Sequence, residues 1–298
     1  MSISGQNLTI VIVTFKSENV IHQCIESIDK DIPIIVVENS NNQKFKDDLE
    51  SKYKNLKCIL SNDNIGMGAG NNIGIKSAKT EYVYILNPDV TLKPNTLEKI
   101  YSASSQITDF SILTPINFDS DFPNWKKKNL KKINNQTQPA QVDSVDGFSM
   151  LLNKNKFENE SYFDENIFLF LENDDLCLRV KKEGGLIFVL PSSEINHKGS
   201  KSVNLKYKNE LELSRNWHWV WSKFYFNRKH FGYLKAAVEC FPTYCSAMVK
   251  FMFYYFLTKL FWNNEKILLR KKIYFNRAQG FYFAFKGKSS CYRPNLAD

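Results

Sequence analysis

Asp89 is the residue whose position most clearly suggests chemistry, because it follows Pro88 at the end of a short apolar run, Tyr82–Leu86. The run is aromatic and β-branched and too short for a core helix, so it predicts a buried strand. Pro88 has no N–H to donate, which ends the strand and places Asp89 at the sheet edge where α/β proteins bind ligands. A carboxylate there suits a hard divalent cation shared with the phosphates of a ligand. The alternative is a turn aspartate that caps a helix beginning near Pro94.

A second group of carboxylates, Glu172, Asp174 and Asp175, lies within four residues at the predicted start of a helix that ends at Gly184. Exposed N–H groups and the helix dipole favour acidic residues at helix starts, so capping explains some of them. Three in one turn exceed what capping requires. Crowded like charges raise one another's pKa, and a general base is more useful when its pKa is nearer 7. The group is therefore a candidate for catalysis, with a purely capping role as the alternative.

Two further features are candidate ligand contacts. His197 follows a predicted strand, 186–190, and Pro191, so we expect it in a loop at a strand end, where it contacts a phosphate or a metal unless it is structural. The glycine-rich run from Asn64 to Gly74 contains neither the dinucleotide nor the P-loop fingerprint. Its glycines would let the backbone approach a ligand beside asparagine amides, or would form a purely structural turn.

A sheet is needed to position these residues. Leu8–Phe15 is apolar without interruption, which predicts a strand covered on both faces. Further strands are predicted at 33–37, 58–60, 82–86, 145–152 and 186–190, and helices at 18–30, 47–53, after the glycine-rich run, near residue 94 and from residue 172. Strands that alternate with helices predict an α/β fold with a mainly parallel, doubly wound sheet.

The composition is that of a globular protein. The chain has 298 residues, of which 43% are hydrophobic and 24% are charged. Its six cysteines show neither CxxC nor metal-ligand spacing, which favours reduced thiols in a cytosolic protein. No apolar segment precedes the first predicted strand, and this argues against secretion.

The charge divides the chain near residue 215. From Arg215 to the end there are 15 Lys and Arg against three Asp and Glu, a balance of +12, so the first 214 residues carry −3 of the total of +9. The same segment holds 24 of the 42 aromatic residues. We therefore predict a catalytic domain at 1–214 and a basic, aromatic-rich helical region at 215–298.

The predicted helical region has the composition of a membrane-surface segment. Residues 241–262 are almost wholly apolar, but Lys250 and Lys259 interrupt any stretch long enough to span a bilayer. Aromatic residues mixed with Lys and Arg suit a helix that lies in the headgroup layer of an anionic membrane. A buried helical subdomain or a dimer face is the alternative. A nucleic-acid surface is disfavoured because no known binding motif is present and the front part is acidic.

Taken together, these residues resemble family 2 glycosyltransferases, most closely the bacterial rhamnosyltransferase-type members that build O-antigen and other cell-surface polysaccharides. The resemblance runs from about residue 8 to the segment 215–217. It lies in an ordered set of motifs: Leu8–Phe15, Glu38-Asn39-Ser40, Asn64-x-Gly66, Asn71-Asn72-x-Gly74, Leu86–Val90, Asp146-Gly147, Phe163-Asp164-Glu165, Glu172–Arg179, Gly184, Pro191 and His197-x-Gly199-x-x-Ser202.

The resemblance implies a GT-A fold and an inverting transfer from a nucleotide-sugar donor, with dTDP-rhamnose as the suggested donor. It implies a divalent cation, Mg²⁺ or Mn²⁺, with Asp89 as a metal residue, and the cation offsets charge on the leaving nucleoside diphosphate. His197 is the second candidate metal residue, from its position in the sequence. Seven positions match the nucleotide-sugar site: Thr14, Phe15, Glu38, Asn64, Gly66, Asn87 and Asp89. Asp146 and Gly147 match the acceptor site.

The sequence departs from the family pattern at two positions. Asn173 stands where relatives often carry the catalytic base, and an amide cannot take that role. Glu38 stands where an aspartate is more usual, which alters the expected contacts with the ribose. The base is therefore sought among the neighbouring carboxylates, with Asp175 or Asp174 favoured and Glu172 as a supporting contact.

We expect a cytoplasmic glycosyltransferase that is peripheral on the inner face of the cell membrane and acts on a lipid-linked or polysaccharide acceptor. A homo-oligomer is compatible with this prediction. One alternative is a sugar-phosphate nucleotidyltransferase, although the residues after the first strand lack the Gly-rich, Arg-containing loop of such enzymes. The other is a catalytically inactive relative that serves as a membrane-bound assembly partner, since a fold can persist without its chemistry.

Overall fold

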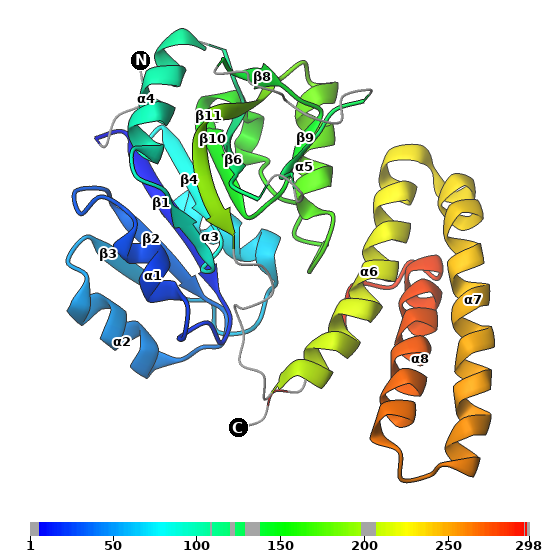
Figure 1. Cartoon of the computed structure of the whole chain (residues 1–298). Coiled ribbons are helices and arrows are strands. Elements are labelled where there is room, and N and C mark those ends of the chain that lie inside the picture. The colour runs from blue at the N-terminus through cyan, green and yellow to red at the C-terminus, as the bar shows by residue number, and fades with distance from the viewer. Residues whose placement is uncertain are drawn as a thin grey trace. The chain divides into compact units, whose positions relative to one another are not determined.

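The protein consists of two compact units, shown in Figure 1. The computed structural model describes residues 6–107, 109–119, 123–128, 138–197, 207–294 and 296. The first unit comprises Met1–Asp164 and Glu172–Asn204, and the second comprises Glu165–Leu171 and Leu205–Asp298. The predicted boundary at residue 215 lies inside helix α6 (Lys208–Phe231), because the basic composition begins about two turns after the helix itself begins.

The first unit alternates strands and helices. Its strands are β1 (Leu8–Thr14), β2 (Ile34–Glu38), β3 (Leu56–Leu60), β4 (Tyr82–Leu86), β5 (Val90–Leu92), β6 (Ile112–Asn117), β7 (Trp125–Lys126), β8 (Ala140–Gln141), β9 (Ser144–Val145), β10 (Ser149–Asn153) and β11 (Ile187–His197). Its helices are α1 (Ile21–Glu26), α2 (Gln43–Lys52), α3 (Met67–Ser77), α4 (Thr96–Gln106) and α5 (Glu172–Lys182), with two short 3-10 turns at Lys154–Lys156 and Glu158–Glu160.

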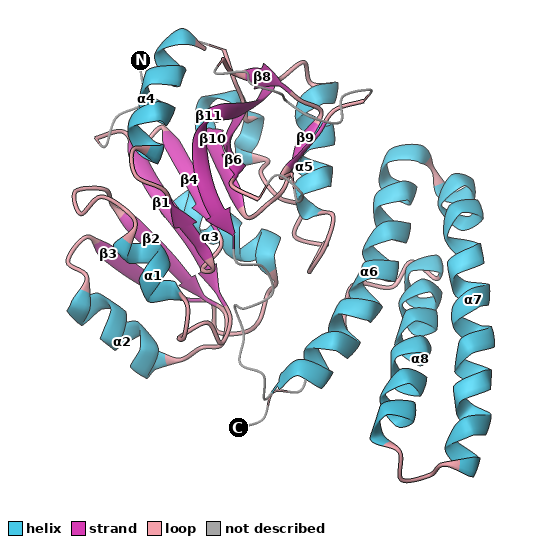
Figure 2. Ribbon diagram, viewed as in Figure 1, coloured by secondary structure: helices cyan, strands magenta, loops and turns pink. Residues whose placement is uncertain are grey.

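The central sheet is mixed, with the order β3-β2-β1-β4-β10-β6-β11-β5 and β8 paired to β11 (Figure 2). The four strands β3, β2, β1 and β4 are parallel, as predicted. Strand β10 runs antiparallel to both of its neighbours, β4 and β6. The predicted strand 145–152 is therefore two strands, β9 and β10, and the turn between them carries Asp146 and Gly147.

Helices cover both faces of this sheet. Apolar side chains of α1, α2 and α4 form one core cluster with alternate residues of the strands, such as Ile10, Val36 and Tyr84. Side chains of α3 and α5 form a second cluster with the intervening residues, such as Val11 and Val37. Every residue of β1 is buried, which confirms the expectation of a doubly covered strand. Burying each such Ile or Val side chain contributes roughly 1.5–3 kcal/mol, so these layers hold the sheet edges in place.

The glycines of α3 serve packing. A Cβ atom at Gly74 would lie 2.3 Å from Cγ1 of Val11, and one at Gly70 would lie 2.9 Å from Cγ1 of Val13. These residues therefore let α3 approach β1 more closely than any other residue type would allow. Of the two interpretations of the glycine-rich run, the structural one holds for Gly70 and Gly74.

The second unit is helical, with α6, α7 (Tyr233–Leu260) and α8 (Glu265–Phe285). Its core contains Trp217, Trp221 and Phe224 of α6 against Phe281 of α8. A Cβ atom at Gly280 would lie 2.3 Å from the carbonyl oxygen of Trp217, so the glycine permits close contact between α6 and α8. Three aromatic residues of α6 are thus core residues, whereas Trp219 and Phe231 of the same helix are exposed.

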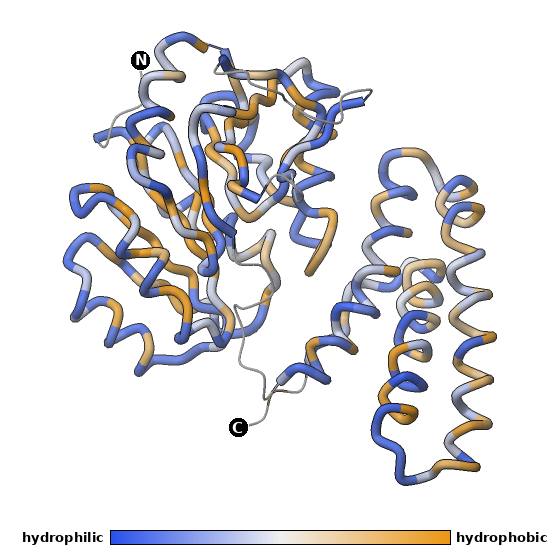
Figure 3. Tube along the Cα trace, viewed as in Figure 1, coloured by the Kyte–Doolittle hydropathy of each residue, from blue (hydrophilic) through white to orange (hydrophobic). Residues whose placement is uncertain are grey.

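Helix α7 carries the exposed apolar surface of this unit, and apolar residues recur along its whole length in Figure 3. Leu234 and Trp262, at and just beyond its two ends, are 77% and 78% exposed. The other exposed members on α7 and after it are Tyr233, Val238, Phe241, Val249, Met252, Phe253, Tyr255, Phe256, Leu260 and Phe261. Among the described residues, no helix is long and apolar enough to cross a membrane.

Candidate active site

Asp89 lies between β4 and β5 and does not cap a helix. Strand β5 begins at the next residue, and α4 begins only at Thr96, whose hydroxyl donates to the carbonyl of Lys93. The turn-cap alternative is therefore excluded. The carboxylate is buried, and its Oδ1 has no hydrogen-bond partner among the described residues. Nε2 of His197 lies 3.4 Å from this oxygen, which is ion-pair distance without hydrogen-bond geometry.

His197 reaches Asp89 because β11 is longer than predicted. The strand continues through Pro191 to His197, which is in register with Val90 of β5. A register shift between Leu190 and Glu194 accommodates the proline, since a bulge tolerates a missing N–H. The predicted loop position of His197 is thus wrong, although the histidine does lie at a strand end. Its ring stacks on Phe148, with centroids 4.0 Å apart, which fixes the direction of the imidazole.

Asp146 joins this group through its charge interactions. Burial raises its pKa most, Lys126 lowers it, Asp174 raises it again and His197 lowers it. Lys126 also forms an ion pair with Asp174, at 3.3 Å between Nζ and Oδ1. Asp146, Asp174, Lys126 and His197 therefore share one electrostatic neighbourhood, which links the β4 edge to the first turn of α5.

Glu172 begins α5 and is the most perturbed carboxyl group of the site. Burial raises its pKa to about 7, its own backbone amide opposes this shift, and the charge of Asp174 adds to it. Its Oε2 is buried without a hydrogen-bond partner among the described residues. A Cβ atom at Gly68 would lie 3.7 Å from the Cβ of Glu172, so the first turn of α3 lies alongside it. A buried carboxyl group with this pKa can take up and release a proton near neutral pH.

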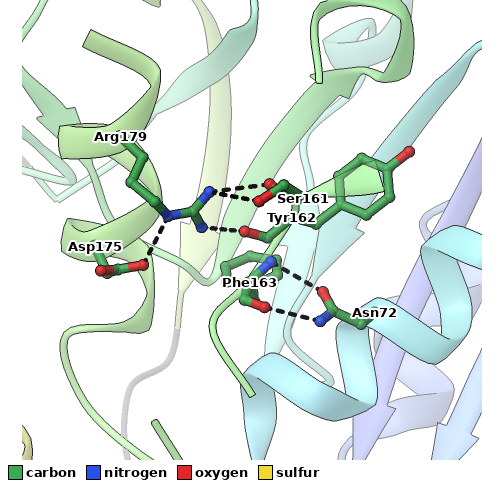
Figure 4. Close-up of polar contacts among 6 residues, drawn as sticks. All are labelled: Asn72, Ser161, Tyr162, Phe163, Asp175 and Arg179. Atoms are coloured by element: carbon green, nitrogen blue, oxygen red, sulfur yellow. Dashed lines mark hydrogen bonds and ion pairs between the residues drawn. The ribbon is translucent and has the colours of Figure 1, made fainter. Parts of the chain in front are cut away.

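Asp175 is held in a different way, as Figure 4 shows. Its side chain is fully buried and its Oδ2 accepts a bond of 2.9 Å from Nε of Arg179. The same guanidinium donates to the carbonyls of Ser161 and Tyr162. Asn72 fixes Phe163, the residue after Tyr162, because its side chain donates to the carbonyl and accepts from the amide of Phe163. Asp175 and Asn72 therefore anchor the segment 161–163 to α5 and α3.

Asn173, the departure from the family pattern, has a structural contact. Its Nδ2 donates to the carbonyl of Val145 at 2.9 Å. A Cβ atom at Gly147 would lie 3.3 Å from the Cβ of Asn173. The side chain therefore fixes the turn that carries Asp146 and Gly147 against the start of α5, and it places the predicted acceptor residues beside the carboxylate group.

The predicted nucleotide residues lie at the carboxyl ends of β1, β2 and β4. Thr14 Oγ1 donates to the carbonyl of Val37 at 3.4 Å, and Phe15 follows it at the end of β1. Both carboxylate oxygens of Glu38 accept from its own turn, from the Ser40 and Asn42 amides at 2.9 and 2.7 Å. Glu38 thus shapes this turn, whatever else it contacts.

The predicted residues Asn64 and Gly66 form a second turn near the first. The side-chain oxygen of Asn64 accepts from the amide of Gly66, whose φ of 89° favours glycine. Nδ2 of Asn39 donates to the carbonyl of Gly66 at 3.0 Å, so the two turns are tied together.

Several buried acceptors at this sheet edge remain without partners. Among the described residues they include the side-chain oxygens of Asn39, Asn71 and Asn87, together with Asp89 Oδ1 and Glu172 Oε2. A buried polar atom without a partner costs about 1–3 kcal/mol, so such a concentration marks a site that a polar ligand completes. Asn39 and Asn71 were not among the predicted site residues, because asparagine after a strand or in a glycine-rich turn is common for local reasons.

A metal ion at this site would rely on few protein ligands. Within the described ranges, no group of three or more His, Cys, Asp or Glu side chains converges as a metal site. Cations that bridge substrate phosphates need one or two carboxylates, and the unpartnered Oδ1 of Asp89 fits this requirement.

Comparison with known proteins places this geometry in context. Residues 9–160 match the sequence model of Glycosyl transferase family 2. The chain is 25% identical over 244 residues to the low-salt glycan biosynthesis hexosyltransferase Agl10 of Haloferax volcanii, covering 70% of this chain and 75% of that protein. It is 26% identical over 217 residues to the dTDP-rhamnosyl transferase RfbF of Shigella flexneri, covering 67% and 72%.

A third relative carries a lipid in its name. The chain is 21% identical over 237 residues to an N-acetylglucosaminyl-diphospho-decaprenol L-rhamnosyltransferase of Mycobacterium tuberculosis, covering 66% of this chain and 77% of that protein. Among solved structures, a mannosyltransferase from Pyrobaculum calidifontis in complex with GDP-Man and Mn²⁺ matches with a TM-score of 0.55 at 11% identity, covering 95% of this chain and 88% of that one. The fold is GT-A-like, with a mixed central sheet and a helical C-terminal region.

Proposed function

From its membership of glycosyl transferase family 2, which makes the chain a glycosyltransferase, we propose that it moves rhamnose from a nucleotide-sugar donor to a lipid-linked glycan acceptor with inversion. The observation that carries the proposal is the pair of buried, unpartnered carboxylate oxygens, on Asp89 at the β4 edge and Glu172 at the start of α5. Relatives named for dTDP-rhamnosyl and rhamnosyl transfer support the choice of sugar.

The donor end of the site is assigned to the β1, β2 and β4 edge. In this proposal Thr14, Phe15, Asn64, Gly66 and Asn87 contact the nucleotide and its sugar together with Asp89. Glu38 holds the turn that faces the ribose. Asp89 and His197 would hold a divalent cation, Mg²⁺ or Mn²⁺, and a Mn²⁺ ion accompanies GDP-Man in the mannosyltransferase of similar fold. When bound, the cation acts as a Lewis acid on the leaving diphosphate.

We assign the base to Glu172 in preference to Asp175 and Asp174. Asp175 is fully buried in its ion pair with Arg179, and Asp174 is partly exposed and paired with Lys126. Glu172 has a free buried oxygen and a pKa of about 7. It takes the proton of the acceptor hydroxyl, whose oxygen bonds to the anomeric carbon as the bond to the phosphate oxygen breaks. Attack on the face opposite the leaving group inverts the configuration.

Asp146 and Gly147 are proposed to orient the acceptor. Their turn is held against α5 by the hydrogen bond from Asn173 to the carbonyl of Val145. The charge of Asp174 raises the pKa of Asp146, so the two carboxyl groups lie near each other. A carboxylate at this position accepts hydrogen bonds from sugar hydroxyl groups, which aims one of them at the base. This role depends on position and hydrogen bonding, so it does not require Asp146 to change its protonation state.

The helical unit is proposed to bind the surface of an anionic membrane. The exposed apolar residues of α7 are accompanied by Lys235, Lys250 and Lys259, whose ammonium groups lie over aromatic rings at 4.1, 5.4 and 5.1 Å from the ring centroids. Aromatic rings with lysine side chains beside them are suited to the headgroup layer of a membrane. The net charge of +12 on residues 215–298 favours a lipid surface over a neutral protein face.

Thermal stabilisation by nucleotide sugars tests the donor assignment. dTDP-rhamnose should raise the melting temperature in the presence of Mn²⁺ or Mg²⁺ and much less with a chelator, because a ligand of the folded state stabilises by mass action. Asp89→Asn should abolish the metal-dependent part, whereas the exposed control Asp48→Asn should retain it. Metal-dependent donor hydrolysis or transfer separates an active enzyme from an inactive assembly partner. Equal melting curves with every nucleotide sugar would contradict the proposal.

Vesicle sedimentation tests the membrane assignment. Leu234→Gln combined with Trp262→Gln should weaken binding to phosphatidylglycerol vesicles while the melting temperature stays unchanged, because both side chains are exposed. Light scattering on the same proteins distinguishes the alternative. If the wild-type chain is a dimer that these substitutions dissociate, and vesicle binding is unaffected, the apolar surface of α7 is a subunit interface.

A further inference from the structure

The second unit contains a pocket that none of the proposed catalytic residues touches. It has a volume of about 380 Å³, which falls within the range of about 300–1,000 Å³ typical of ligand sites. Its lining combines three cations with two aromatic side chains and small polar groups, and all of these residues belong to this unit: Asn166, Trp221, Tyr225, Arg228, Lys229, Ala284, Gly287, Lys288 and Ser289. No acidic residue lines it. We call it the basic pocket.

The fold brings the cations of the basic pocket together from two elements. Arg228 and Lys229 lie in the last turn of α6, and Lys288 lies in the turn after α8. Nη1 of Arg228 lies against Gly287, where an added Cβ atom would be 3.2 Å away. Nε1 of Trp221 donates to the carbonyl of Lys288 at 3.0 Å, which fixes that turn. The positions of these charges therefore follow from packing between α6 and the end of α8.

A purely structural explanation is that these cations only complement the dipoles at the C-terminal ends of α6 and α8. However, backbone amides already cap the carbonyls at the end of α8, since the amides of Lys286, Gly287 and Lys288 donate to the carbonyls of Tyr282, Ala284 and Phe283. The amide of Gly232 does the same for the carbonyl of Arg228. Arg228 and Lys288 also have no carboxylate partner among the described residues. The ammonium of Lys288 lies over the ring of Phe283, 5.0 Å from its centroid, but neither cation has an anionic partner in the part of the chain that the structure describes.

We propose that the basic pocket binds a phosphate or diphosphate group of a membrane lipid. Guanidinium and ammonium groups are the usual partners of phosphate oxygens, and a phosphate between Arg228 and Lys288 would compensate both. The rings of Trp221 and Tyr225 are stacked, 5.0 Å apart, and form an apolar wall for the group attached to the phosphate. Three exposed rings lie where α6 ends, α7 begins and α8 ends: Phe231, Tyr233 and Phe285. These rings suit contact with a lipid chain.

The choice of a lipid phosphate rests on the proposed function, whereas the anion site itself does not. The same chemistry could come from free pyrophosphate or phosphate in solution, so the experiment needs separate arms for the two sources. It also needs to exclude binding at the donor site of the first unit, where a diphosphate is expected together with a cation.

The first arm measures pyrophosphate binding to the full chain by titration calorimetry in EDTA, on an Asp89→Asn background that removes the proposed metal contact. Arg228→Gln with Lys288→Gln should weaken binding by about tenfold for each charge-assisted bond removed. Lys266→Gln with Lys272→Gln, two exposed lysines of α8, removes the same charge and should leave the affinity unchanged. Circular dichroism checks that both double variants are folded.

The second arm compares vesicles of phosphatidylcholine that contain either a polyprenyl diphosphate or an equal charge of phosphatidylglycerol. Wild-type protein should prefer the diphosphate lipid by at least about tenfold, and the Arg228/Lys288 variant should lose this preference. The ratio of the affinities for the two kinds of vesicle removes the contribution of general attraction between the basic surface and anionic lipid. Pyrophosphate binding without lipid preference would assign the pocket to a soluble anion. Equal pyrophosphate affinity in wild type and in the Arg228/Lys288 variant would overturn the proposal, even if the donor assignment holds.

Discussion

The two units leave opposite kinds of group unsatisfied. In the first unit Phe118 is the one large apolar side chain of the described residues that is exposed, and every buried side-chain oxygen or nitrogen without a partner among the described residues belongs to this unit. In the second unit the buried polar groups have partners, whereas all the exposed large hydrophobic residues of the described chain except Phe118 lie here. The contrast indicates two different ligands: a polar molecule completes the sheet edge, and an apolar surface covers the helices.

A comparison within α5 shows the same distinction at the scale of one turn. Glu172 and Asp175 lie three residues apart; Asp175 is fully buried, and Glu172 is half-buried with a buried Oε2. Asp175 has its charge matched by Arg179, so its role is to hold backbone in place. Glu172 has no such partner, and its protonation state depends on burial. The partner, rather than the residue type, separates the two roles.

The largest expected effect is the loss of transfer in Glu172→Gln. General base catalysis contributes roughly 10²–10⁴-fold, so transfer should fall by that factor while donor binding persists. Wild-type kcat should rise with pH through about 7, because the base acts in its ionised form and its pKa is raised to about 7. Progress curves over a pH series measure both effects. If Asp174→Asn abolishes transfer and Glu172→Gln does not, the assignment moves to Asp174.

Asp175→Asn should damage the fold instead of the chemistry. Removing one partner of a buried ion pair costs about 3–5 kcal/mol, because Arg179 is left with an uncompensated charge. Glu172→Gln should instead increase the free energy of unfolding at pH 8, by at most about 3 kcal/mol. The reason is that burial disfavours the ionised carboxyl group that this substitution removes. Urea unfolding at pH 8 compares the two. Equal destabilisation by both changes would remove the distinction between them.

The helical unit should lose stability in acid because of His218. Burial lowers the pKa of this histidine to about 4, and its ring nitrogens contact the Tyr292 carbonyl and the Ser290 hydroxyl. The unfolded chain binds a proton below about pH 6.5 and the folded chain only below about pH 4, so up to about 3 kcal/mol is lost as the pH falls between these values.

Tryptophan fluorescence can follow this loss, because Trp217, Trp219, Trp221 and Trp262 belong to the second unit and Trp125 alone to the first. The pH slope should disappear in His218→Asn. The contribution of Glu172 to the pH dependence of stability has the opposite sign to that of His218. Because its pKa is raised, stability falls as the pH rises from about 4.5 to about 7. An unchanged slope in His218→Asn would show that other groups cause the acid sensitivity.

Gly74→Ala should give the smallest effect, a destabilisation of about 1–3 kcal/mol from overpacking against Val11. Val11→Ala in the same chain should recover part of this loss by making room for the added methyl group. Thermal melting of the single and double variants measures the recovery. A loss of donor binding at unchanged stability would instead mean that Gly74 contacts the ligand, as the glycine-rich run first suggested.

Local sequence patterns predicted much of the first unit. The apolar runs located β1, β2 and β4, and Pro88 correctly placed Asp89 at the end of a strand. These predictions hold because a strand buried on both faces needs uninterrupted apolar residues, and proline ends a hydrogen-bonded ladder. The pattern did not predict that β11 extends to His197, because a bulge at Pro191 depends on pairing with β6.

The sequence by itself determined the family, the alternation of strands and helices, and the identity of the carboxylates that compete for the role of base. The i,i+4 spacing on one helix already brings Arg179 to Asp175. Tertiary structure decided that this pair packs against the backbone of Ser161 and Tyr162, and that Glu172 lies beside the first turn of α3. It also decided that Trp217, Trp221 and Phe224 of α6 are core residues while Phe241, Phe253 and Phe256 of α7 are exposed. Residue type sets what a side chain can do, and only long-range packing sets its neighbours and its access to water.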